Sequence, residues 1–181
     1  MEGCNACQCN KNQTQLLAEK LMPNLIPEKA WTHISADFIM KLPLAQGYDS
    51  ILVVVDRFTK MAYFVPTIER MSTEGLTQLF RDNIWKLHGL PDSIISDRRP
   101  QFMADIMREL NCMLGIKTKL SIVFYPQTDG QTERMNQELE QYFCMFIDHQ
   151  QEQWPEWLGM AEFAYNNMVY MGTKVLPFKA N

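Results

Sequence analysis

The apolar run from Ile51 to Val55 constrains the fold more than any other stretch of the chain. Four of its five residues are β-branched, a composition typical of strands. Side chains alternate between the two faces of a strand, so an unbroken apolar run predicts a strand that is buried inside a sheet. The run is far shorter than the roughly 20 apolar residues that a bilayer crossing needs.

Composition narrows the class of protein. A chain of 181 residues that is 46% apolar suits one globular domain with a sizeable core. The first residues contain no basic segment followed by an apolar one, so we expect a soluble protein that is neither secreted nor membrane-bound. The net charge of −4 gives no support for a nucleic-acid partner, and any such case depends on local features.

Alternating segments predict three strands, at residues 31–40, 50–55 and 61–65, joined as an antiparallel meander. Ser72 then caps a predicted helix that ends at Gly89. The apolar stripe expected on this helix consists of Leu76, Leu79, Phe80, Ile84 and Leu87.

In the second half of the chain, the spacing of apolar residues alternates between the period of a strand and the period of a helix. We expect a strand at 93–96, a helix, a strand at 117–123, and helices at 131–149 and 155–169. The helix after the first of these strands should turn Phe102, Ile106, Leu110 and Met113 inward. The result is a mixed, three-layer α/β fold with five strands flanked by helices. On the last helix, Trp154, Trp157, Phe163 and Tyr165 indicate helix packing rather than a platform for stacked bases.

Residues 1–30 form a polar tail and linker, interrupted by Pro23 and Pro27. Cys4 and Cys7 have the spacing of half a zinc site, but no histidine pair completes it, so an inert tail without zinc is the favoured interpretation. The chain has five cysteines, an odd number that favours a reducing compartment. Cys112 and Cys144 fall in helical patterns, where a thiol commonly serves as a small apolar residue.

Three acids stand out by context: Asp37 on the first strand, Asp97 after the fourth, and Glu133 in the first turn of a helix. A solvated surface position is the alternative for each of them. Glu133 lies about 200° around its helix from the core residue Met135, so it faces away from the core. The three carboxylates could converge at one edge of the sheet and hold hard divalent cations.

Four sequence motifs then point to a family. They are Asp56-Arg57-Phe58-Thr59-Lys60-Met61, His88-Gly89-Leu90-Pro91, Ser96-Asp97-Arg98, and Pro126-Gln127-Thr128-Asp129-Gly130-Gln131-Thr132-Glu133-Arg134. The chain resembles the catalytic core of integrases from gypsy-class LTR retrotransposons over about residues 31–178. The Cys4 and Cys7 pair is similar to the second half of the family's amino-terminal zinc finger.

This resemblance implies a ribonuclease H-like fold with a catalytic, metal-binding triad of Asp37, Asp97 and Glu133. It implies two Mg²⁺ or Mn²⁺ ions per active site, with processing of the 3′ ends of element DNA and strand transfer into target DNA. The implied partners are these two DNAs and further copies of the chain, with no small-molecule substrate. Action in the nucleus, or a cytoplasmic location, is inferred in the same way.

A basic rim near the acids could bind DNA phosphates. The candidate cations are Lys60, Arg98, Arg99, Lys117, Lys119 and Arg134, and the candidate amides are Gln127, Asn136 and Gln137. Ordinary solvated surface is the alternative for each cation.

We therefore expect a tail with a finger remnant at 1–30 and an integrase catalytic core at 31–181, truncated at its carboxy-terminal end. Two other interpretations stay open. A catalytically inactive remnant could serve as a dimerisation or interaction module. A ribonuclease H-type nuclease that cuts RNA in hybrids would share the fold and metals, although the phrase at 126–134 argues against it.

Overall fold

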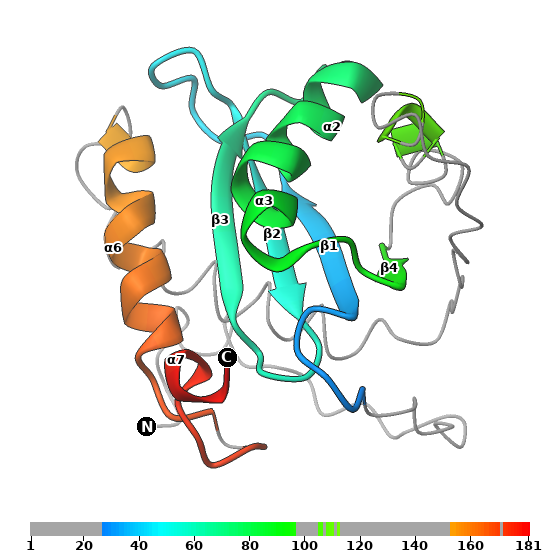
Figure 1. The fold of residues 1–181 in the computed structure, drawn as a ribbon. Helices are drawn as coiled ribbons and strands as arrows, with labels where there is room; N and C mark the ends of the chain where they lie inside the picture. The colour runs from blue at the N-terminus through cyan, green and yellow to red at the C-terminus, as the bar shows by residue number, and fades with distance from the viewer. Residues whose placement is uncertain (1–26, 97–104, 107, 111, 113–152, 171) are drawn as a thin grey trace, which may run out of the picture.

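The computed structural model describes residues 27–96, 105–106, 108–110, 112, 153–170 and 172–181. Its strands are β1 (His33–Ile39), β2 (Ser50–Asp56), β3 (Ala62–Thr67) and β4 (Ser93–Ile95). They form one sheet in the order β3-β2-β1-β4 (Figure 1). The pairs β1–β2 and β2–β3 are antiparallel, whereas β1 and β4 are parallel, so the sheet is mixed.

The predicted meander is confirmed, and so is the short fourth strand, each close to its expected bounds. The described helical elements are α2 (Thr73–Phe80), the π-helical η1 (Arg81–Trp85), α3 (Lys86–His88), α6 (Trp154–Asn166) and α7 (Pro177–Ala180). The predicted strand at 117–123 and helix at 131–149 lie outside the described residues.

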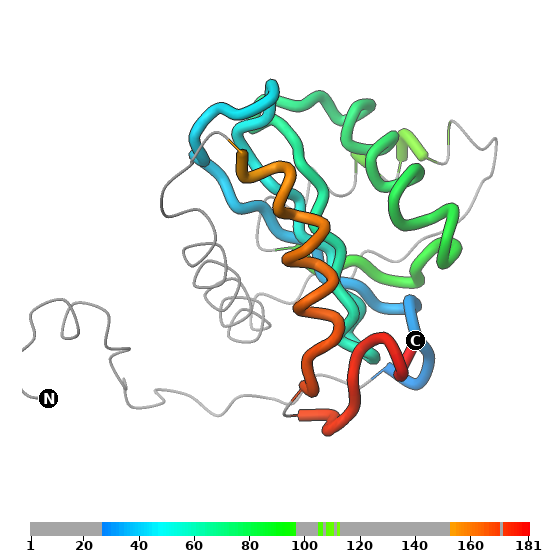
Figure 2. Tube along the Cα trace, turned by 90° about the vertical axis from the view of Figure 1, so that its left-hand side faces the viewer, coloured from blue at the N-terminus to red at the C-terminus, as the bar shows by residue number. Residues whose placement is uncertain are grey.

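Strand β2 is buried along its whole length, which explains its apolar run. Leu52 and Val54 belong to the core cluster beneath α2 and η1. Ile51, Val53 and Val55 belong to a second cluster that includes residues of α6. Helices therefore cover both faces of the sheet, as the two views of the chain show (Figure 1, Figure 2). The alternation of a strand distributes one apolar run between two cores.

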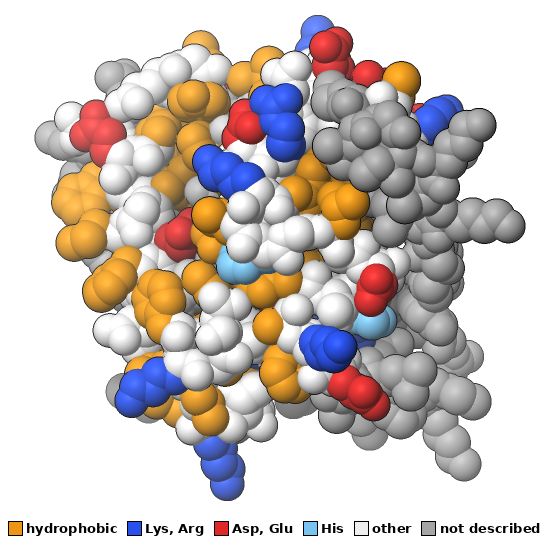
Figure 3. Space-filling view, viewed as in Figure 1, with side chains coloured by type: hydrophobic (Ala, Val, Ile, Leu, Met, Phe, Trp, Pro, Cys, Tyr) orange, Lys and Arg blue, Asp and Glu red, His pale blue; other side chains and the backbone are white. Residues whose placement is uncertain are grey.

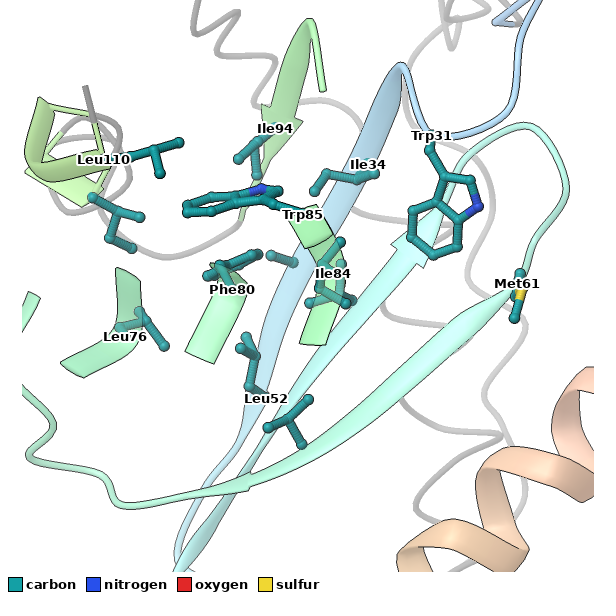
Figure 4. Packing of buried hydrophobic residues seen from close by; sticks show 14 residues of the cluster. Trp31, Ile34, Leu52, Met61, Leu76, Phe80, Ile84, Trp85, Ile94 and Leu110 are labelled. Carbon is teal, nitrogen blue, oxygen red and sulfur yellow. The ribbon is translucent and has the colours of Figure 1, made fainter. Parts of the chain in front are cut away.

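The helix after β3 begins as predicted, because Ser72 Oγ accepts a hydrogen bond from Gly75 N–H at 3.1 Å. The predicted apolar stripe is buried as far as Ile84, with Leu76, Phe80 and Ile84 each almost fully buried (Figure 4). The prediction for Leu87 is wrong: this side chain is 57% exposed.

Trp85 is buried in place of Leu87, and the π turn of η1 explains the exchange. The N–H of Lys86 donates to the carbonyl of Arg81, five residues earlier instead of four. Such a turn accommodates more residues than an α-helical turn, so it shifts the phase of the buried stripe. The helix then ends at Gly89, where φ is +80°, a value that glycine adopts without strain.

Helix α6 packs against the opposite face of the sheet through Trp154, Leu158 and Ala161. The indole Nε1 of Trp154 donates to the carbonyl of Pro43 at 2.8 Å. Tyr165 also packs on this cluster, and the ring of Phe163 lies 5.9 Å from that of Phe178 on α7. Trp157 and Phe163 are nevertheless 40% and 57% exposed, so they lie outside the core that Trp154 joins. Phe163 follows Trp154 by nine residues, which places it about 180° around the helix.

Helix α6 also covers the open edge of β3. The carboxamide of Asn166 accepts a hydrogen bond from Ala62 N–H and donates one to Ala62 C=O, both at 2.8 Å. One helical turn earlier, Glu162 Oε2 accepts from Phe64 N–H at 2.9 Å. Four residues of helix rise about 6 Å and two residues of strand span about 6.7 Å, so the side chains match the ladder of the strand.

The described residues between 105 and 112 are helical, and Ile106 and Leu110 are buried as predicted. Phe102 and Met113, the other members of that stripe, lie outside the described residues. Cys112 is exposed, so it does not play the apolar role expected of it. In the described part of the chain, no helix combines the length and apolar character required for a membrane span.

The hydrogen bonds between Asn166 and the edge of β3 generate a first prediction. Asn166→Ala leaves the N–H and C=O of Ala62 without partners in a buried position, which we expect to lower the free energy of unfolding by roughly 2–4 kcal/mol. Urea denaturation followed by circular dichroism measures this loss. Asn167→Ala makes the same change at the next, exposed residue and should alter stability by no more than about 0.5 kcal/mol. Equal effects of the two substitutions would contradict the role given to Asn166.

A second prediction concerns pH. Burial raises the pKa of the Glu162 carboxyl, and the hydrogen bond from Phe64 offsets only part of this rise. Because the folded state holds this proton more tightly than the unfolded state, Glu162 favours folding below its ordinary pKa of about 4.3. That contribution is lost as the pH rises through the raised pKa of the folded state.

Glu162→Gln keeps an acceptor for Phe64 N–H but removes the titration. We therefore expect the variant to gain stability relative to the unmodified chain as the pH is raised from about 4 to 7. Urea denaturation of both proteins at several pH values measures the difference. Glu156→Gln, on an exposed part of α6, is the matched control. The idea fails if this control shows a pH dependence of the same size.

Candidate active site

Asp37 is the one predicted triad member within the described residues, and it lies on β1. Ile34 and Ala36 join the cluster beneath α2, and Ile39 joins the cluster beneath α6. Alternation therefore places Asp37 on the α6 side of the sheet. Its side chain is only 9% exposed, and its Oδ1 accepts a hydrogen bond from Phe38 N–H at 2.8 Å.

Strand β4 approaches Asp37 through its parallel pairing with β1. The register pairs His33 with Ser93, Ile34 with Ile94, and Ser35 with Ile95. Asp37 lies two residues beyond the last of these pairs, at the end of β4 from which the chain leaves the sheet. Asp97 occupies the corresponding sequence position, two residues after Ile95, and lies outside the described residues.

The remaining predicted site residues, apart from Lys60, also lie outside the described residues. Their roles therefore stay predictions. These residues are Glu133, Cys4, Cys7, Arg98, Arg99, Lys117, Lys119, Gln127, Arg134, Asn136 and Gln137. Among the residues that the structure does describe, no three His, Cys, Asp or Glu side chains are grouped closely enough to hold a metal ion. Asp37 is therefore the described part of the candidate site.

Lys60 lies in the turn between β2 and β3, away from Asp37. This turn contacts the start of β1, where Arg57 N–H donates to the carbonyl of His33 at 3.0 Å. His33 and Asp37 are four residues apart on an extended strand, which corresponds to about 13 Å. The structure thus places Lys60 at the opposite end of β1 from the carboxyl end of β4.

Asp56 belongs to one of the sequence motifs but was not predicted to have a role of its own, and this acid organises the turn. It is fully buried, and its Oδ2 accepts hydrogen bonds from Thr59 N–H at 2.8 Å and from Thr59 Oγ1 at 2.7 Å. Its Oδ1 accepts from Trp31 N–H at 3.0 Å. The spacing of an Asp followed three residues later by Thr is the signal that points to such a turn.

His88 contacts Trp31 and Tyr63 and does not lie near Asp37. Its ring stacks on Trp31, with centroids 3.7 Å apart, and its Nε2 forms a 2.8 Å hydrogen bond with the hydroxyl of Tyr63. Burial lowers the pKa of His88, and the nearby charge of Asp56 opposes this effect. Burial, followed by the charge of Glu162, raises the pKa of Tyr63. Both rings therefore favour their neutral forms and serve to attach the helix end to the sheet.

Comparisons with known proteins identify the family and the fold of the chain. Residues 27–126 match the family model described as the integrase core domain. The Tf2-3 and Tf2-4 transposon polyproteins of Schizosaccharomyces pombe are each 32% identical to the chain over 179 residues. That alignment covers 99% of this chain but only 13% of each polyprotein, so the chain corresponds to a small part of these relatives.

Solved structures share the fold. The integrase catalytic core domain of HTLV-2 in complex with magnesium, in a trimeric form, aligns with a TM-score of 0.60 and 17% identity, covering 83% of this chain and 95% of that one. The simian T-cell lymphotropic virus intasome in complex with the PP2A regulatory subunit B56 gamma aligns with a TM-score of 0.65 and 18% identity, covering 98% and 62%.

The expected ribonuclease H-like architecture is thus confirmed for the four described strands and their flanking helices. The family match spans more than half of the chain, and the retrotransposon relatives align along nearly all of it. The chain therefore belongs to the integrase core domain family, in the gypsy-class branch of LTR retrotransposons.

Proposed function

We propose that this chain cleaves and joins phosphodiester bonds of DNA as a two-metal polynucleotidyl transferase. Water would act as the nucleophile when the 3′ ends of element DNA are processed. The resulting 3′ hydroxyl would act as the nucleophile when those ends are joined to target DNA. The observation that carries the proposal is the buried Asp37 carboxylate on β1, next to the carboxyl end of the parallel strand β4.

The pairing of β1 with β4 supports the triad. Each paired residue of β4 has a number 60 higher than its partner in β1, and Asp97 has that same relation to Asp37. We therefore propose that Asp97 joins Asp37 in the site, and that Glu133 supplies the third carboxylate. Acidic groups so placed repel one another unless cations are bound between them.

The donor set fits hard divalent cations, since carboxylate oxygens are the ligands that Mg²⁺ and Mn²⁺ prefer. When bound, two such ions would lower the pKa of the attacking water and stabilise the leaving oxygen. Asp37, Asp97 and Glu133 would hold the ions. The sheet would keep the Asp37 carboxylate in place through burial and through its bond to Phe38 N–H. No covalent bond between enzyme and DNA is required.

We propose that phosphates of the bound DNA are contacted by Arg98, Arg99, Lys117, Lys119, Arg134, Gln127, Asn136 and Gln137. Joining two DNA ends needs more than one active site, so several copies of the chain would act together. The similar HTLV-2 integrase catalytic core domain occurs in dimeric and trimeric forms, and the similar simian T-cell lymphotropic virus structure is an intasome. Integration would take place in the nucleus.

The second candidate function is an inactive dimerisation module, and one observation favours it. Helix α6 presents Trp157, Met160 and Phe163 to solvent, with exposed fractions of 40%, 63% and 57%. Figure 3 shows apolar side chains on the left of the molecule, over this helix. Apolar residues spaced three apart on one helix are suited to packing against a second copy of the chain. Dimerisation is compatible with either function, so metal binding is the property that separates them.

The third prediction tests the chemistry by the reversal of strand transfer on a branched DNA substrate with Mg²⁺ or Mn²⁺. We expect Asp37→Asn and Glu133→Gln each to lower the rate at least about a hundredfold, because each removes a metal-binding carboxylate. Asp92→Asn makes the matching change at an exposed acid just before β4 and should leave the rate unchanged. Preferential cleavage of an RNA–DNA hybrid over duplex DNA would instead identify a ribonuclease.

The fourth prediction tests metal binding without activity. Mn²⁺ at about 100 times its dissociation constant should stabilise the folded chain by about 2.7 kcal/mol, which raises the melting temperature. Asp37→Asn should lose most of this shift, whereas Asp92→Asn should keep it. Differential scanning fluorimetry measures both. If a folded protein shows no shift with Mn²⁺ and still dimerises, the inactive module is the correct function.

A further inference from the structure

We infer that the β2–β3 turn and the loop before α7 form a second DNA-backbone contact, about 13 Å along β1 from Asp37. We call this surface the basic end and define it by Arg57, Lys60 and Lys174. The inference rests on the proposed function, because it takes DNA to be the substrate. It assigns Lys60 to a surface separate from the acidic site.

The turn that carries Lys60 is rigidly built. Asp56 N–H donates to Met61 C=O, and Lys60 N–H donates to Asp56 C=O, both at 2.9 Å. The buried carboxylate of Asp56 fixes Thr59 between them. Lys60 has a φ of +67°, in the left-handed region, and Lys174 in the facing loop has a φ of +56°. A cation displayed from a fixed turn loses little conformational freedom in the backbone when an anion binds.

Tyr170 joins the two segments. The Nζ of Lys60 lies 5.9 Å from the centroid of its ring, within the range of a cation–π contact. Lys174 N–H donates to the carbonyl of Tyr170 at 2.8 Å. A Cβ at residue 172 would lie 2.9 Å from Tyr170 Cε1, so Gly172 permits the ring to occupy this place. The ring thus holds the ammonium of Lys60 close to the loop of Lys174.

The charges of these segments differ from those of the whole chain. Residues 57–68 contain Arg57 and Lys60 but no acid, and the chain after Glu162 contains Lys174 and Lys179 but no acid. The net charge of the chain is nevertheless −4. Figure 3 shows Lys and Arg side chains at its lower edge, over α7 and the loop before it. Arg57, Lys60, Lys174 and Lys179 therefore lie in two segments that carry no acid of their own.

Of the acids near this end, Asp56 lies inside the turn, whereas Glu28 and Asp92 are exposed near the start of β1. Asp56 is fully buried and is engaged by Trp31 and Thr59. Burial lowers the pKa of Lys60, the charge of Arg57 lowers it further, and Asp56 opposes this effect. Two ion pairs of the described residues, Arg81 with Asp82 and Arg108 with Asp105, lie away from Lys60. An external anion near Lys60 would relieve its repulsion from Arg57.

The phosphodiester backbone of duplex DNA is the anion that fits best. Successive phosphates of one strand advance by about 3.4 Å along the helix axis, so a span of about 13 Å corresponds to roughly four nucleotides. This span separates Asp37 from His33, the residue of β1 that the β2–β3 turn contacts. Contacts from lysine to phosphate add affinity and fix register without reading sequence.

The fifth prediction uses the full chain and a fluorescent duplex DNA of random sequence, without metal, in a series of salt concentrations. Lys60→Gln and Lys174→Gln should each weaken binding roughly threefold to tenfold, and each should reduce the slope of log affinity against log salt by about one. Gln46 has a φ of +52°, so glutamine is compatible with this backbone conformation. Arg70→Gln, which removes an exposed cation beyond the far end of β3, should bind like the unmodified chain.

Thermal unfolding shows that each variant is folded before its affinity is compared. The inference is overturned if Lys60→Gln and Lys174→Gln bind DNA as Arg70→Gln does, and the proposed function still stands if the unmodified chain cleaves branched DNA. The opposite result separates the two ideas as well. If the basic-end variants lose affinity while the unmodified chain shows no metal-dependent cleavage, the surface exists and the proposed chemistry does not.

Discussion

The hydrogen bonds accepted by the buried carboxylate of Asp56 hold three parts of the domain together. They link the end of β2, the turn at Thr59 and the backbone of Trp31, just before β1. Trp31 in turn stacks on His88 at the end of α3, and its indole donates to the side chain of Asn181. The C-terminus therefore lies beside the start of β1 (Figure 2). Burying a carboxylate is costly unless its oxygens are satisfied, so loss of any of these donors would affect the whole end of the sheet.

The sheet separates the two candidate sites along β1. The carboxyl end of β4 meets β1 near Asp37, whereas the β2–β3 turn meets β1 at His33. Both are fixed by the same strand, so their separation does not depend on a flexible connection. A substrate that contacts both is positioned by the rigid part of the fold, which is the arrangement that favours a defined orientation of a reacting group.

Much of this architecture could be predicted because it follows from local patterns. The run at Ile51–Val55, the Ser72 cap and the stripe of Leu76, Phe80 and Ile84 each depend on neighbours a few residues away. The error at Leu87 arose because a π turn cannot be read from apolar spacing. Likewise, the acidic character of Asp37 is visible in the sequence, but its burial and its position beside β4 depend on a pairing across 60 residues. The turn role of Asp56 had a local signal, whereas its bond to Trp31 had none.

The match between α6 and β3 restricts how this domain can change length. Asn166 and Glu162 pair with Ala62 and Phe64 only because four helical residues and two strand residues cover nearly the same distance. Inserting or deleting one residue between these two side chains would rotate one of them by about 100° and remove it from the strand. Chain-length variation is therefore better tolerated in the loop after Asn166 than within the last turn of α6. The spacing of residues along the last turns of α6 therefore has to match the spacing of residues along β3.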